Sequence, residues 1–203
     1  MSLKALAINC TLKASGDEPS STDVLLNQIK EALAKHDVAT EIVRIADVEV
    51  PPGVTADEGK GDGWPAVRKK LMASDILLLG TPIWMGQPSS LCKRVVERMN
   101  AFLDETDSEG RMVTYGKVGG VAVVGNEDGA HHVSAELYQA LNDLGFSIPA
   151  NAVAYWVGEA MGGVDYKDLK LTPVKVQQTI NALAANAAHL ASVLKRNAYP
   201  GSG

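Results

Sequence analysis

The chain has 203 residues, of which 46% are hydrophobic and 21% are charged, values typical of one globular domain with a substantial core. Its net charge of -5 is mild, so composition does not favour nucleic acid or an anionic membrane as a partner. No segment approaches the roughly 18 apolar residues of a membrane-spanning helix, and the first residues lack the apolar core of a secretion signal. We therefore expect a single cytoplasmic domain over residues 1–203, without a membrane partner.

The predicted elements alternate between short apolar strands and amphipathic helices. The predicted strands cover residues 3–8, 41–45, 75–80, 118–124 and 148–157. The predicted helices cover residues 22–36, 65–73, 88–103, 133–144 and 173–195, with a loop over 47–63 and a frayed tail over 197–203. This alternation predicts a parallel sheet with helices on both faces. In such sheets ligands bind beyond the carboxyl ends of the strands, at the topological switch point.

The first loop at that edge carries an unusual number of hydroxyl groups around one lysine: Thr11, Lys13, Ser20, Ser21 and Thr22. If the first helix begins near Thr22, its unpaired amides and its dipole favour an anion at this position. A single capping hydroxyl would satisfy the helix start, so three in a row indicate a phosphate site. The P-loop pattern and the G-x-G-x-x-G pattern of dinucleotide folds are both absent.

The second loop, residues 80–90, follows the third predicted strand. Pro82 and Pro88 stiffen it, and Gly86 allows a positive φ or a close approach of backbone to a ligand. Trp84 would offer a flat apolar wall for an aromatic ring, although a lone core tryptophan at a strand end would give the same pattern.

The third loop, residues 125–132, is polar and bracketed by glycines. Asn126, Glu127 and Asp128 are suited to hydrogen-bond a heterocycle, and Asp128 is equally suited to cap the next helix. A phosphorylated flat heterocycle would satisfy all three loops together.

Metal chemistry is not expected from this sequence. Cys10 and Cys92 are far apart and form neither a CxxC pair nor a metal-binding spacing, which favours reduced thiols. His131 and His132 are adjacent, but no further His or Cys stands at a metal-ligand spacing.

These loops resemble those of the NADPH-dependent FMN reductase family of flavodoxin-like proteins, over residues 3–194. Residues 81–88 read Thr-Pro-Ile-Trp-Met-Gly-Gln-Pro, which is similar to the family pattern Thr-Pro-x-Tyr/Trp-x-Gly-x-x-Pro, with the final proline one position earlier. Residues 11–13 and 21–22 stand at the Ser-Pro-Arg and Ser/Asn-Thr positions of the family's first loop. The resemblance implies a three-layer, doubly wound, five-stranded parallel sheet with strand order 2-1-3-4-5.

Two departures from the family pattern accompany this resemblance. The spacer over residues 14–20 is long and carries Asp17 and Glu18, which we expect to point to solvent because acids beside a phosphate are unfavourable. The cysteine cluster of the iron–sulfur flavoproteins is missing.

The resemblance also implies FMN as cofactor, NADPH or NADH as co-substrate, and hydride transfer at the flavin N5 without a required catalytic side chain. The implied phosphate-binding residues are Thr11, Lys13, Ser20, Ser21 and Thr22. The implied ring-binding residues are Thr81, Pro82, Ile83, Trp84, Met85, Gly86, Gly125, Asn126, Glu127, Asp128, Gly129 and His132.

The expected partners are a small-molecule electron acceptor, such as a quinone or free flavin, and further copies of the chain in a homodimer or homotetramer. The alternative function is a flavodoxin-type electron carrier that binds FMN but does not use NAD(P)H. Such carriers tend to be strongly acidic, and the mild charge of this chain disfavours that alternative.

Overall fold

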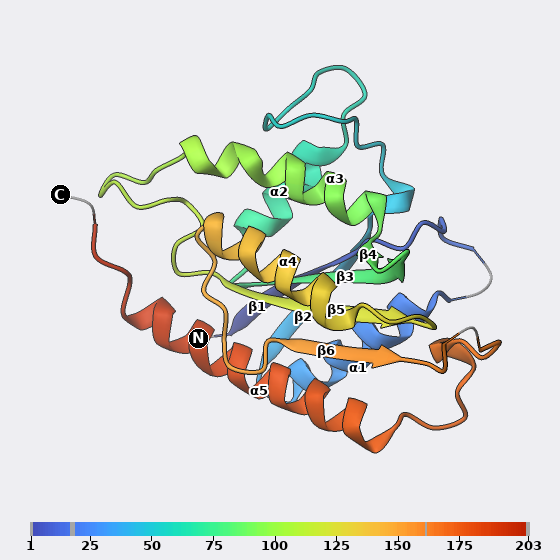
Figure 1. Ribbon diagram of the computed structural model, residues 1–203. Coiled ribbons are helices and arrows are strands. Elements are labelled where there is room, and N and C mark those ends of the chain that lie inside the picture. The colour runs from blue at the N-terminus through green and yellow to red at the C-terminus, as the bar shows by residue number, and fades with distance from the viewer. Residues whose placement is uncertain (1, 17–18, 161, 202–203) are drawn as a thin grey trace.

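A parallel β-sheet forms the middle layer of the computed structural model, which describes residues 2–16, 19–160 and 162–201 (Figure 1). Its parallel strands follow the order β2-β1-β3-β5-β6, and a two-residue strand, β4, pairs antiparallel with the end of β3. The strands are β1 (Leu3–Asn9), β2 (Val38–Arg44), β3 (Ile76–Trp84), β4 (Gln87–Pro88), β5 (Val118–Gly125) and β6 (Val153–Val157). Because β5 and β6 are the fourth and fifth predicted strands, the predicted order 2-1-3-4-5 is confirmed.

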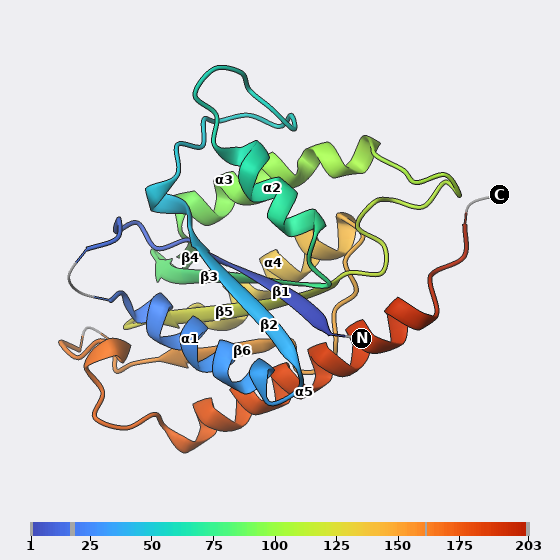
Figure 2. The ribbon, with the colours of Figure 1, turned by 180° about the vertical axis from the view of Figure 1, so that it is seen from behind.

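Helices cover both faces of this sheet (Figures 1 and 2). One face carries α1 (Ser21–Ala34) and α5 (Val174–Arg196), and the other carries α2 (Trp64–Met72), α3 (Ser90–Met99) and α4 (Ala130–Asp143). The connections among the described residues contain three short 3-10 helices: η1 (Ile45–Asp47), η2 (Asn100–Asp104) and η3 (Tyr166–Asp168). Among the described residues, no helix combines the length and the apolar character needed to cross a membrane.

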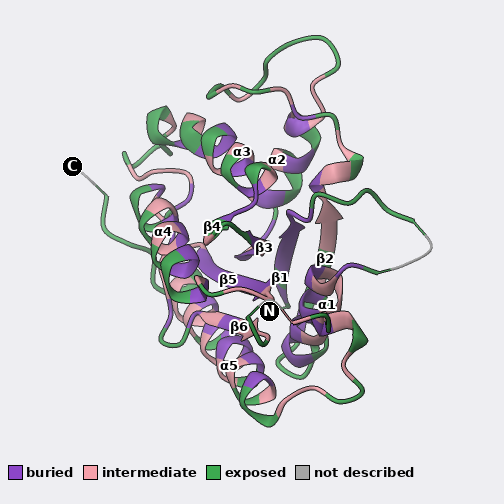
Figure 3. Ribbon diagram, turned by 45° about the vertical axis from the view of Figure 1, so that its right-hand side comes forward, coloured by how far each residue is buried: buried purple, intermediate pink, exposed green. Residues whose placement is uncertain are grey.

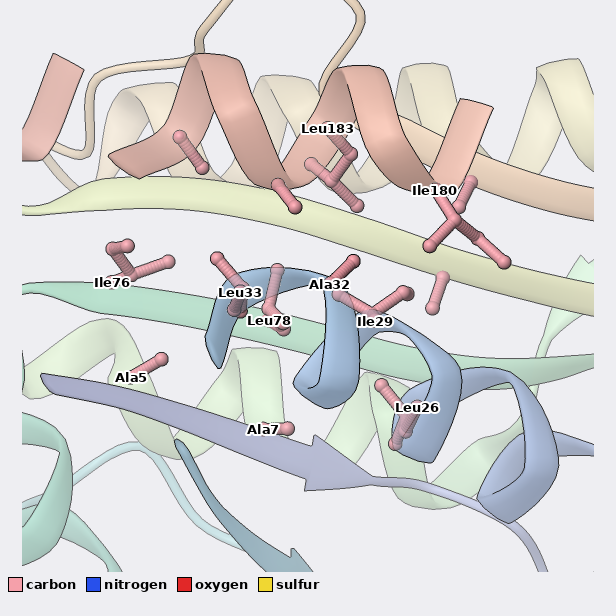
Figure 4. Close-up of a cluster of buried hydrophobic side chains, with 14 of the residues drawn as sticks. Ala5, Ala7, Leu26, Ile29, Ala32, Leu33, Ile76, Leu78, Ile180 and Leu183 are labelled. Atoms are coloured by element: carbon pink, nitrogen blue, oxygen red, sulfur yellow. The ribbon is translucent and has the colours of Figure 1, made fainter. Parts of the chain in front are cut away.

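The strand side chains alternate between two apolar layers, which accounts for the doubly wound arrangement. In β3, Ile76 and Leu78 pack with α1 and α5, whereas Leu77 and Leu79 pack on the opposite side with α2, α3 and α4. Figure 4 shows the first layer, where side chains of α1 and α5 meet those of β1 and β3, and Figure 3 shows the buried strands between the helices. Since both sheet faces are covered, a ligand reaches the sheet only at an edge.

The edge formed by the carboxyl ends of the parallel strands lies at the right in Figure 1. The chain leaves β1 toward α1 on one face and leaves β3 toward α3 on the other, so the switch point lies between these two strands.

Three strand boundaries differ from those predicted by three residues or more. β3 continues past residue 80 to Trp84 because Ile83 and Trp84 pair with Pro88 and Gln87. β2 begins three residues earlier than predicted, at Val38, while β6 begins only at Val153. The second of the predicted loops is therefore a β-hairpin continuous with the sheet.

The loop over residues 48–63 is held to α3 by a buried ion pair. Arg98 Nη2 lies 2.6 Å from Asp62 Oδ2, both side chains are 0% exposed, and Arg98 Nε also donates to the Thr55 carbonyl at 3.1 Å. Burial disfavours the Asp62 carboxylate, but hydrogen bonds from Arg98 and from two backbone amides outweigh it and lower the pKa of Asp62 to about 2.

The predicted frayed tail covers residues 197–203, of which 202 and 203 lie outside the described residues. α5 ends at Arg196, as the pattern indicated within one residue. The Tyr199 ring lies 5.5 Å from the Tyr115 ring, and its hydroxyl is 2.8 Å from Ser147 Oγ. These contacts attach the tail to the strand edge opposite the carboxyl ends.

Candidate functional site

A cavity of about 470 Å³ opens at the carboxyl edge of the sheet, at the switch point between β1 and β3. It brings together most residues of the three predicted loops: Thr11, Lys13, Ser20, Ser21, Thr22, Pro82, Ile83, Trp84, Met85, Gly125, Asn126 and Glu127. Its remaining lining comes from Leu12, Val124, Trp156, Asp165, Tyr166 and Lys167. The three loops predicted from the sequence therefore share one cavity. Residues of β6 and of the segment after it, which were not predicted, also line this cavity.

The backbone of the first loop is held by side chains at the ends of β1 and β2. Asn9 is buried, accepts from the Thr11 amide at 3.0 Å and donates to the carboxylate of Asp23. Arg44 pairs with Asp23 and donates to the Ala14 carbonyl at 2.9 Å. Because Arg44 compensates the charge of Asp23, the acid in the first turn of α1 does not leave this end of the cavity negative. Asp17 and Glu18 lie outside the described residues.

The three hydroxyls at the start of α1 have three different roles. Ser20 is the N-cap: its hydroxyl accepts from the Asp23 amide at 3.1 Å, and its own amide donates to the Asp23 carboxylate at 2.8 Å. Ser21 Oγ accepts from the Lys167 amide at 3.3 Å. Thr22 is 1% exposed and lines the cavity, and its hydroxyl has no partner among the described residues. A hydroxyl that lines a cavity in this way can donate a hydrogen bond to a ligand.

The second loop is a tight two-residue hairpin closed by a carboxylate. Met85 and Gly86 have φ values of +54° and +72°, as in a type I′ turn, between the paired residues Trp84 and Gln87. Glu127 accepts from the Met85 amide at 3.0 Å and from the Gly86 amide at 3.2 Å. Glu127 therefore acts as a clamp on the hairpin, with both carboxylate oxygens engaged.

Close packing continues behind the hairpin. A Cβ atom on Gly129 would lie 3.0 Å from the Cα of Gly86, so only glycine fits at this φ of +129°. Gly129 is also the N-cap of α4 without a side-chain cap, so the alternative that Asp128 caps this helix is wrong; Asp128 Oδ1 instead accepts from the Gly129 amide at 2.7 Å.

Thr81 supports the hairpin and does not line the cavity. It is 0% exposed; its hydroxyl accepts from the Ser89 amide at 3.0 Å and donates to the Pro82 carbonyl at 2.9 Å. Ser89 in turn donates to the Cys10 carbonyl at 2.6 Å and caps α3. Through Ser89, Thr81 thus connects the end of β3 to Cys10, the residue that follows β1.

Four further predicted residues also lie outside the cavity lining: Gly86, Asp128, Gly129 and His132. His132 is more than half exposed and lies on the outer side of the hairpin, with its Nε2 2.9 Å from Gln87 Nε2 and 3.9 Å from a carboxylate oxygen of Glu136. This position removes His132 from direct contact with a ligand in the cavity.

A further wall of the cavity, which the sequence pattern does not predict, comes from Trp156 of β6 and from residues 165–167 of the segment after it. The rings of Trp156 and Tyr166 lie 5.4 Å apart, and Asn126 Nδ2 donates to Asp165 Oδ1 at 2.8 Å. The Tyr166 hydroxyl donates to Gln28 Oε1 at 2.5 Å, and burial raises the pKa of Tyr166. Parallel strands all end at the same edge, so the loop after the fifth strand could have been included on that ground alone.

Both cysteines occupy buried positions in the core. Cys10 and Cys92 are both free and fully buried. Burial, and then the neighbouring Cys92 thiol, raise the pKa of Cys10 well above its usual value, so it is a neutral thiol near pH 7. No group of His, Cys, Asp and Glu suited to a metal ion occurs among residues 2–16, 19–160 and 162–201.

Comparison with known proteins identifies flavin-related relatives. The sequence model described as "NADPH-dependent FMN reductase" matches residues 3–161. The chain is 33% identical to the 8-demethyl-8-aminoriboflavin-5'-phosphate synthase of Streptomyces davaonensis, over 98% of this chain and 81% of that protein. It superposes with TM-score 0.88 and 32% identity on a crystal structure of RosB with bound 8-demethyl-8-formylriboflavin-5'-phosphate, covering 98% of this chain and 82% of that one.

Two other similarities are more limited. The chain is 38% identical, over 82% of its length, to a protein of Mycobacterium bovis named divalent metal cation transporter, but it spans only 25% of that protein. An NADH:FMN oxidoreductase structure shares the fold with TM-score 0.62 at 15% identity, over 95% of this chain and 90% of that one. The family match and the flavin-related relatives support FMN as cofactor and NAD(P)H as co-substrate. On this match, which extends from β1 to beyond β6, the chain belongs to the NADPH-dependent FMN reductase family.

Proposed function

We propose that this protein is an FMN-dependent oxidoreductase that takes hydride from NADPH or NADH and passes it to a small electrophile, such as a quinone or a free flavin. The observation that carries the proposal is the cavity at the switch point, where hydroxyl, lysine and aromatic side chains converge. Its volume of about 470 Å³ lies in the range of small-molecule sites, roughly 300–1,000 Å³.

The start of α1 fits the phosphate of FMN. Thr22 offers a hydroxyl that has no hydrogen-bond partner among the described residues, and Thr11, Lys13 and Ser21 line the same cavity around the helix N-terminus. Neutral donors, a lysine and the positive end of the helix dipole together suit a phosphate dianion. Ser20 contributes by capping the helix and thereby fixing the geometry of this end.

The hairpin and the aromatic wall fit the flat ring. Trp84 is 53% exposed and Met85 is 89% exposed at the mouth of the cavity, whereas Trp156 and Tyr166 are more deeply buried in its wall. We propose that the ring lies against this wall and the hairpin, with the open mouth left for a nicotinamide or an acceptor.

When bound, FMN supplies the two-electron chemistry by accepting and donating hydride at N5. The chain's own residues bind and orient the reactants, and no side chain is assigned a proton transfer. Both oxygens of Glu127 are engaged by backbone amides, and the thiol of Cys10 is neutral and buried.

The test is an anaerobic titration of the FMN-loaded protein with NADPH and with NADH, followed by absorbance. We expect bleaching in one two-electron step with little semiquinone, followed by turnover with a quinone or free flavin. A large, stable semiquinone without bleaching by either nicotinamide would instead establish the flavodoxin-type carrier.

A second candidate function treats a flavin phosphate as the substrate. It is favoured by the 33% identity, over 98% of this chain, to a relative named as an 8-demethyl-8-aminoriboflavin-5'-phosphate synthase. Mass spectrometry of the flavin after prolonged aerobic turnover with amino donors distinguishes the two functions. An unchanged flavin mass supports the reductase, and a mass change at the flavin supports the synthase-like activity.

We further propose that the protein acts as a homodimer or homotetramer in the cytoplasm. Leu171 is 84% exposed and Val174 is 71% exposed near the start of α5, which supports an interface there. The two free, buried cysteines are consistent with a reducing compartment. Sedimentation analysis of the wild type and of a Leu171→Ser, Val174→Ser variant tests the assembly, since a monomeric wild type would contradict it.

A further inference from the structure

Lys167 lies beside the first turn of α1, although it comes from the other end of the chain. It belongs to η3, and its backbone amide donates to Ser21 Oγ at 3.3 Å. Its side chain lines the cavity and is only 18% exposed, with Nζ 3.7 Å from Asp168 Oδ1. The α1 end of the cavity therefore has a second lysine, one that sequence spacing does not reveal.

The segment that carries Lys167 is attached to α1 at more than one point. Tyr166 donates to Gln28 Oε1 at 2.5 Å, and Gln28 Nε2 donates to Thr172 Oγ1 at 2.9 Å. With the Ser21 contact, these bonds fix the backbone of Lys167 relative to the helix start. A backbone held in this way needs little reorganisation when a ligand binds.

The charge at this end of the cavity needs such a cation. A phosphate monoester carries about -1.5 to -2 charges near pH 7. Asp23 and Arg44 compensate each other, so the helix dipole and neutral hydroxyls act on the ligand together with the lysines, of which Lys167 also has its Nζ 3.7 Å from Asp168 Oδ1. Lys13 is exposed to solvent, where its attraction is screened, whereas the side chain of Lys167 is largely buried.

We propose that Lys167 is the cation by which this cavity selects a 5'-phosphorylated flavin over an unphosphorylated one. The proposal rests on the proposed function as a flavin-binding site. It assigns the loop after the fifth parallel strand a direct role in ligand recognition, in addition to forming a wall.

The experiment compares Lys167→Met with Lys170→Met, an exposed lysine of the same segment that does not line the cavity. FMN and riboflavin are titrated into each apoprotein by flavin fluorescence, at low and at high salt. For Lys167→Met we expect FMN affinity to fall about tenfold or more, because hydrogen bonds to charged groups are the stronger ones. Riboflavin affinity should change by less than about twofold, and Lys170→Met should bind both ligands as the wild type does. Lys167→Arg should recover part of the FMN affinity, and the salt dependence of FMN binding should weaken in Lys167→Met.

Two results for the Lys167→Met variant would overturn the inference. Equal losses for FMN and riboflavin in a folded Lys167→Met variant would make Lys167 a structural residue of the segment. An unchanged FMN affinity would place the phosphate elsewhere. If Thr22→Val is selective for FMN while Lys167→Met is not, only the role of Lys167 fails. If wild-type protein binds neither flavin, the proposed function fails as well.

Discussion

The carboxylate clamp on the hairpin can be tested by the substitution Glu127→Gln. In the wild type, Glu127 accepts from the Met85 amide at 3.0 Å and the Gly86 amide at 3.2 Å. Glutamine keeps one acceptor oxygen but presents an NH₂ group to the second amide, which then faces a donor. One of the two hydrogen bonds is therefore lost without a replacement inside the protein.

The expected change in the free energy of hairpin opening follows from the hydrogen bond that is lost. A hydrogen bond to a charged group contributes about 1.5–3 kcal/mol, and the partial exposure of Glu127 favours the lower end. Met85 also holds a φ of +54°, which costs a non-glycine residue about 1–2 kcal/mol and must be offset by the turn's own bonds. We expect the opening of the hairpin to become more favourable by about 1.5 kcal/mol, close to tenfold in its equilibrium constant.

The direct assay is amide hydrogen exchange at Met85 and Gly86. Protection of one or both amides should fall about tenfold in Glu127→Gln, and FMN affinity should fall by no more than the same factor. Adding Met85→Gly should restore part of the loss, because glycine adopts the positive φ without strain. Asp128→Asn is the matched control, since Asp128 contacts the amide of its own loop and not the hairpin. Unchanged protection at both amides in Glu127→Gln would refute the clamp.

Further predictions concern the ligand, the thiols and the buried ion pair. FMN should bind more tightly than FAD, because the proposed phosphate site at the start of α1 suits a terminal phosphate; equal or tighter binding of FAD would contradict this. Thr22→Val should weaken FMN by on the order of 1 kcal/mol or somewhat more and leave riboflavin almost unaffected, whereas equal losses would make Thr22 a structural residue. A Cys10→Ala, Cys92→Ser variant should keep its flavin and its turnover, and loss of turnover in a folded variant would show a redox role. The lowered pKa of Asp62, about 2, means that its ion pair with Arg98 stabilises the fold fully above about pH 4 and less as the pH falls toward 2. Asp62→Asn should remove this acid-dependent part and cost about 3–5 kcal/mol at pH 7 in denaturant unfolding, because it leaves a buried guanidinium unpaired; a stability curve unchanged with pH would argue against the pair.

Local patterns in the sequence determined the order of strands and helices and the edge at which the site lies. The apolar run of β3 is buried on both faces, as expected of a central parallel strand, and α1 starts where its capping serine predicts. These features can be predicted from the sequence because the spacing of apolar residues and helix capping involve residues that are close together in the chain. Once the strands are parallel and doubly wound, geometry brings their following loops to one edge, so the first and third loops could be expected in one cavity.

The tertiary structure alone decided which side chains of those loops face the cavity. Thr81 belongs to the most specific sequence pattern, yet its hydroxyl is turned inward to Ser89. Glu127 was expected at the ring, but it closes a hairpin 41 and 42 residues away in sequence. Lys167 contacts Ser21 across 146 residues. The direction of a loop side chain is set by partners that are distant in sequence, and no local period or spacing carries that information.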